Sequence, residues 1–136
     1  MSLALQLALS LGATVGALGG VVWSGITHRR AVHYRFVSLF VACLAVAIWR
    51  AEVYGRGLRF EGTSAVVHAI HMGSVAATFV ALPFVVVTGV RLARGTRRSG
   101  GGDPRRAHHR ASEIFVGLVL LTSALGTAMT LLASRV

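Results

Sequence analysis

The stretch that decides the fold is "TSAVVHAIHMGSVAATFVALPFVVVTGV", residues 63–90, which contains no Asp, Glu, Lys or Arg. A helical run of about 20 mostly apolar residues is long enough to cross the hydrocarbon core of a bilayer. Working outward from this stretch, further predominantly apolar runs occupy residues 3–26, 36–54 and 112–133. The sequence therefore predicts a membrane protein with four spanning helices.

The four runs use nearly the whole chain of 136 residues, so no soluble domain remains. Hydrophobic residues make up 54% and charged residues 13% of the chain, against about 25% charged residues in soluble proteins. The first run lacks a basic leader and is too long for a signal peptide, so we treat it as a retained helix. We predict an all-α fold, an integral membrane antiparallel four-helix bundle in one domain, 1–136. The expected helices are 3–26, 31–54, 63–93 and 107–133, with a flexible cytoplasmic loop over 94–106.

The charge distribution predicts the orientation in the membrane. All fourteen basic residues are Arg, and the net charge is +10. Because Arg-rich loops stay in the cytoplasm, both termini are expected outside the cytoplasmic membrane of a bacterium. The Arg residues flank apolar spans and do not alternate with stacking aromatics, so we expect lipid headgroups and not nucleic acid as their partners. The cytoplasmic set is Arg29, Arg30, Arg35, Arg91, Arg94, Arg97, Arg98, Arg105, Arg106 and Arg110, and the outer set is Arg50, Arg56, Arg59 and Arg135.

The first span contains "GATVGALGG", in which Gly12, Gly16 and Gly20 recur at four-residue spacing. Small residues at this spacing let two membrane helices approach closely. We expect the face formed by Gly12, Gly16 and Gly20 to pack against a helix of this chain or of a larger membrane complex.

Histidines at membrane depth are the candidate functional residues. His68 and His71 lie three positions apart on a stripe of the third span that also carries Ser64 and Thr78. Ionisable side chains at such depth are costly, so function is the first hypothesis. Copper would suit His71 with Met72 and Cys43, since soft thioether and thiolate ligands favour Cu(I), and His68 is a further candidate metal ligand. Haem would suit His33 with His108 or His109 near the inner surface.

Structural readings of the same residues stay open. His28, His33, His108 and His109 stand at the membrane boundary beside Arg, where a histidine can simply favour the headgroup region. His71 could instead be a structural histidine bonded to a Ser or Thr of a neighbouring helix. The chain shows no nucleophile with a base, phosphate loop or carboxylate pair, so we do not expect an enzyme.

The order of several short motifs resembles the YozB or CtaM family of small four-helix bacterial membrane proteins. The motifs are "HRR" at 28–30, "SLF" at 38–40, "YGRGLRFEG" at 54–62, "IHM" at 70–72, "LP" at 82–83 followed by Thr88, and "HHR" at 108–110. The resemblance implies His28, His71 and His109 as functional histidines and a link to maturation of haem-copper oxidases. The family also tends to carry a His near the end of its second helix, where this chain has Ile48, Trp49 and Arg50.

Three functions remain as hypotheses. The first is an accessory or maturation protein of a respiratory, haem-copper type complex that handles haem or copper through His71, with His109, His28 and His33 as further candidate ligands. The second is a b-type cytochrome that transfers electrons in the membrane. The third is a structural subunit of a larger complex with no cofactor.

Overall fold

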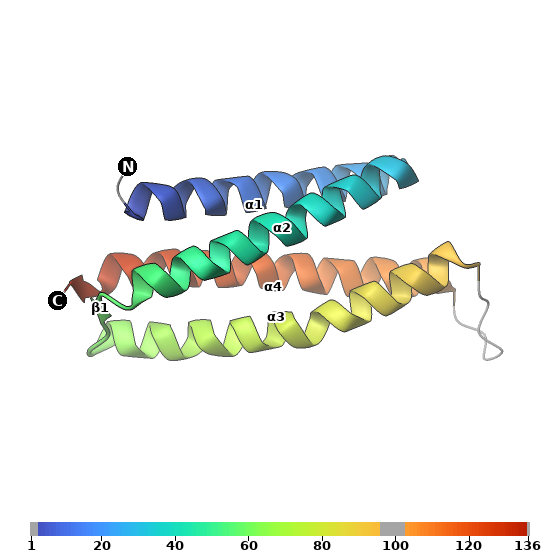
Figure 1. Ribbon diagram of the computed structural model, residues 1–136. Helices are drawn as coiled ribbons and strands as arrows, with labels where there is room; N and C mark the ends of the chain where they lie inside the picture. Colours follow the sequence, from blue (N-terminus) through green and yellow to red (C-terminus); the bar gives the residue numbers. More distant parts are fainter. Residues whose placement is uncertain (1–2, 96–102, 136) are drawn as a thin grey trace. The chain divides into compact units, whose positions relative to one another are not determined.

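The computed structural model describes residues 3–95 and 103–135 and is almost entirely helical (Figure 1). The elements are α1 (Leu3–Ile26), α2 (Arg30–Gly55), β1 (Leu58–Arg59), α3 (Thr63–Ala93), α4 (Pro104–Leu132) and β2 (Ser134–Arg135). The all-α class predicted from the sequence is confirmed. All four helices are long and apolar enough to cross a membrane.

The chain divides into two compact units, each built on a helical hairpin. One unit contains residues 1–59 and 134–136 and the other contains residues 60–133. In the first unit α1 packs against α2, and in the second α3 packs against α4. The single domain over 1–136 stays a prediction, and each unit is described separately below.

The α1–α2 hairpin turns sharply between Ile26 and Arg30, where His28 has a positive φ of 56°. At the opposite end Arg50 of α2 donates a hydrogen bond to the side-chain oxygen of Gln6 on α1. These contacts at both ends show that the two helices run in opposite directions. The buried side chains of this unit are Leu7, Thr14, Ala17, Leu18 and Ser24 on α1 and Phe40 and Ala47 on α2.

The α3–α4 hairpin has a mixed seam of small polar and apolar side chains. Ser64 and Ser74 are buried on α3, and Phe115 and Val119 are buried on α4. Helix α3 continues through Pro83, which cannot donate to the carbonyl four residues earlier, and it bends in its second half (Figure 1). The predicted loop over 94–106 lies partly outside the described residues, which omit 96–102.

Helix α4 begins at Pro104, three residues before the start predicted from the sequence. The Asp103 carboxylate accepts a hydrogen bond of 3.0 Å from the backbone N–H of Arg105. Asp at the N-cap followed by Pro at the first helical position is a strong helix-start signal. The sequence prediction assigned 94–106 to a loop and therefore placed the start of this helix three residues too late.

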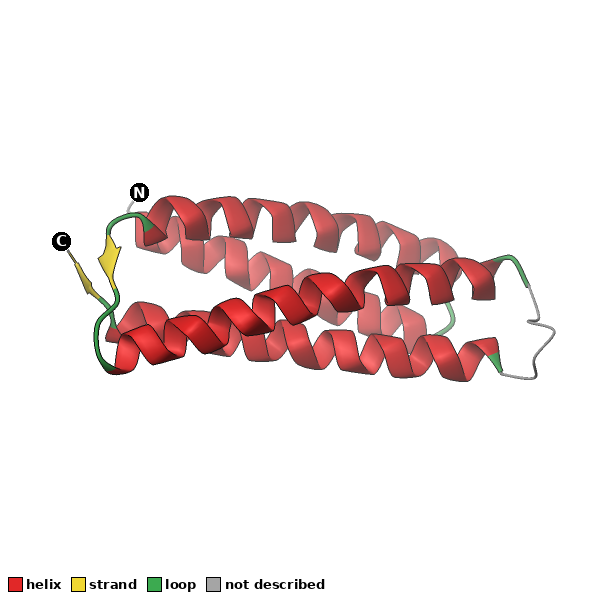
Figure 2. Ribbon diagram, turned by 90° about the horizontal axis from the view of Figure 1, so that it is seen from below, coloured by secondary structure: helices red, strands yellow, loops and turns green. Residues whose placement is uncertain are grey.

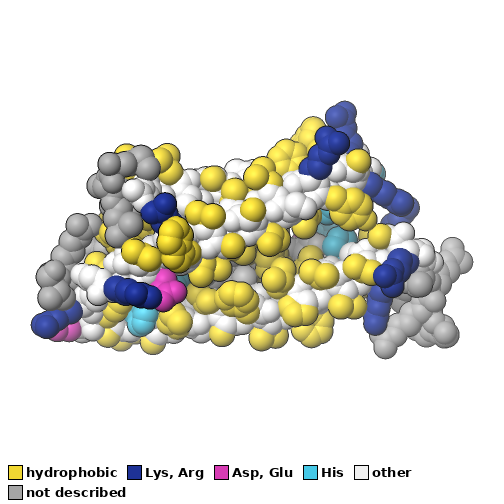
Figure 3. Space-filling model, in the orientation of Figure 1, with side chains coloured by type: hydrophobic (Ala, Val, Ile, Leu, Met, Phe, Trp, Pro, Cys, Tyr) yellow, Lys and Arg dark blue, Asp and Glu magenta, His cyan; other side chains and the backbone are white. Residues whose placement is uncertain are grey.

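A two-residue antiparallel pairing of β1 with β2 completes the first unit, with Leu58 opposite Arg135 and Arg59 opposite Ser134 (Figure 2). Outside the seams the helices expose large apolar side chains, and Arg side chains cluster toward helix ends (Figure 3). Exposed fractions reach 63% at Phe84 and 65% at Val80 in α3. Surfaces of this kind are unfavourable in water and suit a hydrocarbon environment.

Candidate functional site

His33 lies one turn into α2 and bridges back to α1. Its Nδ1 is 3.1 Å from the carbonyl oxygen of Val21 and 3.3 Å from Oγ of Ser24. A carbonyl oxygen only accepts hydrogen bonds, so Nδ1 must carry the ring proton. The neutral ring then has its lone pair on Nε2, the nitrogen that a metal would bind. Gly25 lies beside the ring, and a Cβ there would lie 3.7 Å from it, an ordinary contact distance.

His71 makes the equivalent bond from α3 to α4. Its Nδ1 lies 3.1 Å from the carbonyl oxygen of Thr122, which again places the proton on Nδ1 and the lone pair on Nε2. Gly126 stands against the ring, because a Cβ at this position would come within 3.0 Å of Cε1 of His71. A metal-ligating histidine is typically oriented by this kind of hydrogen bond from its other nitrogen.

A small hydroxyl cluster supports His71 from one side. Oγ1 of Thr122 donates to Oγ of Ser74 at 3.1 Å and lies 3.2 Å from Oγ1 of Thr78. Ser74 in turn donates to the carbonyl oxygen of His71 at 2.7 Å. Hydrogen bonds between helices stabilise membrane packing by about 1 kcal/mol each or less. The stripe containing His71 and Thr78 therefore faces α4, as the spacing had predicted for an interior face.

His68 contacts residues that the sequence did not link to it. Its Nδ1 lies 3.0 Å from the thioether sulfur of Met129 on α4, and its ring stacks on Phe60 at 4.4 Å between centroids. Met72, the thioether proposed for a copper site, is 51% exposed. Within residues 3–95 and 103–135, no group of three or more His, Cys, Asp or Glu side chains is arranged to hold a metal ion.

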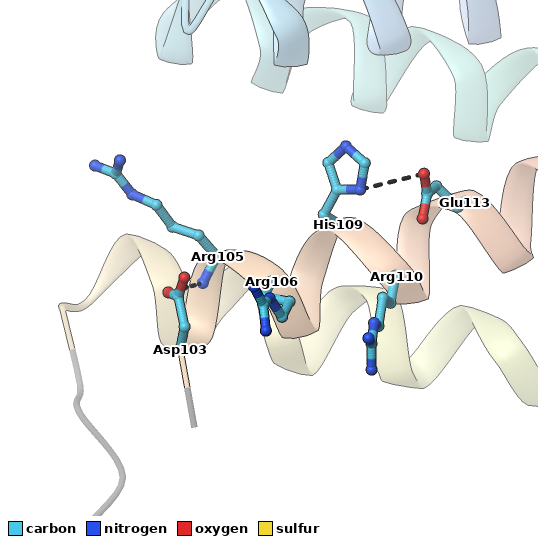
Figure 4. Close-up of a pocket in the computed structure, with 6 residues that line it drawn as sticks. All are labelled: Asp103, Arg105, Arg106, His109, Arg110 and Glu113. Carbon is cyan, nitrogen blue, oxygen red and sulfur yellow. Dashed lines mark hydrogen bonds and ion pairs between the residues drawn. The ribbon is translucent and has the colours of Figure 1, made fainter. Parts of the chain in front are cut away.

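His28 and His109, two of the histidines implied by the family resemblance, are exposed. His28 occupies the α1–α2 turn. His109 lies 3.3 Å from the Glu113 carboxylate on the same helix, and both side chains are more than half exposed, at 74% and 64%. His109 and Glu113 line a hollow at the start of α4. The side chains of Arg106 and Arg110 point to the other side of the helix from these two residues (Figure 4). An exposed pair of this kind contributes little to stability.

His108 was predicted from the sequence only as an alternative to His109 as a haem ligand. Its Nδ1 lies 3.2 Å from Oγ1 of Thr88 on α3, and a Cβ at Gly89 would approach its Cε1 to 3.1 Å. The Thr88 hydroxyl also lies 2.7 Å from the carbonyl oxygen of Phe84. His108 therefore contacts a hydroxyl of the partner helix, whereas His33 and His71 also contact a backbone carbonyl. The available signal was the pair "TG" at 88–89, which repeats the "SG" at 24–25.

The glycine face predicted on α1 divides into two parts. A Cβ at Gly20 would overlap the ring of Phe36 on α2, so Gly20 serves the contact within the hairpin. Cβ atoms built at Gly12 and Gly16 meet no described atom within 4 Å. Whether these two glycines contact another protein stays a prediction.

No protein-family model, curated protein or solved structure matches the chain. The chain is an all-α protein of two helical hairpins with four candidate membrane spans, in which interhelical hydrogen bonds hold the imidazoles of His33, His71 and His108.

Proposed function

We propose that this chain is a multi-pass membrane protein that handles haem through imidazoles held on its helical hairpins, as an accessory or maturation protein of a respiratory oxidase. The observation that carries the proposal is the hydrogen bonding of His33 and His71. In each ring Nδ1–H donates to a backbone carbonyl of the partner helix, and the lone pair on Nε2 is left for iron.

Haem fits this geometry better than a copper ion does. The porphyrin supplies the equatorial ligands of haem iron, so the protein needs to add only one or two axial side chains. Individually held imidazoles meet that need. A copper site built only from protein ligands needs several donors converging on one point, and the Met72 side chain proposed for it is mostly exposed. When bound, haem supplies one-electron redox chemistry.

The membrane part of the proposal rests on the exposed surface of the helices. We place α1 to α4 as four spans of alternating direction in an antiparallel four-helix bundle, with the two Arg-rich turns in the cytoplasm and both termini outside. Large apolar side chains such as Phe79 and Phe84 would contact lipid. The link to a respiratory complex rests on the resemblance to the YozB or CtaM family.

A b-type cytochrome is the second candidate, favoured by the spacing of histidines along the α3–α4 hairpin. Along α3, His71 and Thr88 are separated by a rise of about 25 Å at 1.5 Å per residue. Thr88 contacts His108, so the imidazoles of His71 and His108 lie near different ends of this hairpin. Imidazoles at both ends of a span are the arrangement needed for electron transfer across a membrane.

An absorption spectrum of the purified protein tests the proposal. We expect a Soret band in the isolated protein, or its appearance on titration with hemin, and a sharp visible band after reduction with dithionite. His71→Ala should reduce the haem bound, whereas His109→Ala should not, because the His109 side chain is mostly exposed. Absence of any hemin binding by the wild-type protein would refute the haem proposal, and His71-dependent copper in a metal analysis would replace it with the copper alternative.

Labelling with a membrane-impermeant thiol reagent tests the orientation separately. Cys43 is the single cysteine of the chain, so a Cys43→Ser background accepts one new cysteine at a time. We expect Gly57→Cys, between α2 and α3, to react in intact cells, and Thr27→Cys, between α1 and α2, to react only after the membrane is opened. The reverse pattern would invert the proposed topology.

A further inference from the structure

The sequences of α1 and α3 match each other without a gap. The segment "LALSLGATVGALGGVVWSGI", residues 7–26, aligns with "HMGSVAATFVALPFVVVTGV", residues 71–90. Near its end, each segment has two valines, then one apolar residue, then a hydroxyl residue and a glycine: "VVWSG" at 21–25 and "VVVTG" at 85–89. The identical pairs are Ser10 and Ser74, Ala13 and Ala77, Thr14 and Thr78, Ala17 and Ala81, Leu18 and Leu82, Val21 and Val85, Val22 and Val86, and Gly25 and Gly89.

The second helices of the two hairpins match in the same way. The segment "RAVHYRFVSLFV", residues 30–41, aligns with "RRAHHRASEIFV", residues 105–116. The identical pairs are Arg30 and Arg105, His33 and His108, Arg35 and Arg110, Phe40 and Phe115, and Val41 and Val116. This alignment pairs His33 with His108 and not with its neighbour His109.

The hydrogen bonds of the hydroxyl residue at the turn end repeat in both hairpins, whereas the bond from His33 to the Val21 carbonyl is described in the first hairpin only. Ser24 bonds the carbonyl oxygens three and four residues before it, at 3.0 and 2.7 Å, and Thr88 does so at 3.1 and 2.7 Å. Hydroxyls often make such bonds within a helix, so these alone say little. The bond across the hairpin is more specific. Oγ of Ser24 lies 3.3 Å from Nδ1 of His33, and Oγ1 of Thr88 lies 3.2 Å from Nδ1 of His108.

The packing around these bonds is also shared. Gly25 and Gly89 each face the imidazole of their own hairpin. Phe40 and Phe115 occupy the same position in the second helix and are both buried, at 4% and 6% exposure. Aligned residues therefore have similar burial or similar neighbouring groups in both hairpins.

The outer histidines are not part of the shared pattern. The first alignment pairs Leu7 with His71. Continued at the same offset, the second alignment pairs Ala47 with Thr122, the hydrogen-bond partner of His71. His71 therefore belongs to the second hairpin alone, whereas the turn-end imidazole belongs to both.

We infer that the chain is a tandem repeat of one two-helix hairpin and that each copy presents one turn-end imidazole, His33 in the first and His108 in the second, to an iron tetrapyrrole. The identity of the ligand rests on the proposed function, whereas the equivalence of the two histidines does not. A shared ancestor explains why both rings have the same type of hydroxyl partner and the same facing glycine.

Hemin titration of the full-length protein in detergent tests the assignment, with the Soret absorbance as the readout. We expect His33→Ala and His108→Ala each to reduce hemin binding by about tenfold or more and by similar factors, because loss of even an outer-shell partner of a metal ligand costs about 10–100-fold in affinity. His109→Ala is the matched control, because it removes the adjacent imidazole of the same helix, and it should bind hemin as the wild type does.

The outcomes separate this inference from the proposed function. If His108→Ala binds hemin as well as His109→Ala does while His33→Ala loses binding, the inference is overturned and the haem proposal stands. If the wild-type protein binds no hemin, the haem proposal fails and takes the tetrapyrrole assignment with it.

Thermal stability tests the equivalence without hemin. Ser24→Ala and Thr88→Ala should lower the melting temperature by similar amounts, because each removes the hydroxyl that lies within hydrogen-bond distance of the imidazole. Thr88→Ser keeps that hydroxyl and should retain most of the stability. A loss confined to one hairpin, or a Thr88→Ser variant as unstable as Thr88→Ala, would overturn the equivalence.

Discussion

The contact between Gly126 and His71 gives the sharpest prediction of stability. A Cβ added by Gly126→Ala would lie 3.0 Å from Cε1 and 3.5 Å from Nδ1 of the His71 ring. The ring must retreat to reach an ordinary contact distance, and its 3.1 Å hydrogen bond to the Thr122 carbonyl must lengthen as it does. The substitution therefore strains both the packing and the polar contact at the candidate site.

The magnitude follows from two opposing effects. Overpacking a well-packed seam costs about 1–3 kcal/mol, whereas replacing Gly by Ala inside a helix contributes about 0.5–1 kcal/mol of stability. Gly117→Ala on the same helix isolates the second effect, because a Cβ there meets no described atom within 4 Å. We expect Gly126→Ala to have a free energy of unfolding about 1–3 kcal/mol below that of Gly117→Ala.

The assay is reversible unfolding of both variants in detergent micelles by titration with a denaturing detergent, with helicity measured by circular dichroism. Hemin binding gives a second readout, because displacement of the His71 ring should weaken binding in Gly126→Ala and not in Gly117→Ala. If the two variants unfold at the same detergent fraction and bind hemin equally, the His71 ring does not lie against Gly126 and the reasoning is refuted.

Two further predictions concern α1 and the start of α4. Gly20→Ala should destabilise the α1–α2 hairpin, because its Cβ would overlap the Phe36 ring, whereas Gly16→Ala should be neutral or slightly stabilising; equal melting temperatures for the two variants would contradict this packing. Glu113→Gln should change the free energy of unfolding by no more than about 1 kcal/mol, since its ion pair with a histidine is mostly exposed. A larger loss, measured in the same detergent titration, would mean that Glu113 is buried in the working protein.

Helix number and type could be predicted from the sequence because they depend on local composition. Runs of apolar residues as long as a bilayer is thick predict helices wherever they occur, and the described helices begin and end within a few residues of the expected positions. The one clear difference, the start at Pro104, arises from a capping signal that was present in the sequence and was given too little weight.

The choice between adjacent histidines could not be made from composition. His108 and His109 are neighbours in sequence but point about 100° apart on a helix, so only one of them can face the partner helix. His108 contacts Thr88, and His109 contacts Glu113 on its own helix. The comparison of the two hairpins with each other would have selected His108, because it pairs with His33 in that alignment.

The sequence by itself determined that this protein is helical, strongly apolar and rich in Arg at helix ends, because these properties follow from the order of residue types along one chain. The tertiary structure decided which face of each helix meets its neighbour. Only that packing places the carbonyl oxygens of Val21 and Thr122 beside imidazoles, and a carbonyl that accepts from Nδ1 is what fixes the tautomer of His33 and His71.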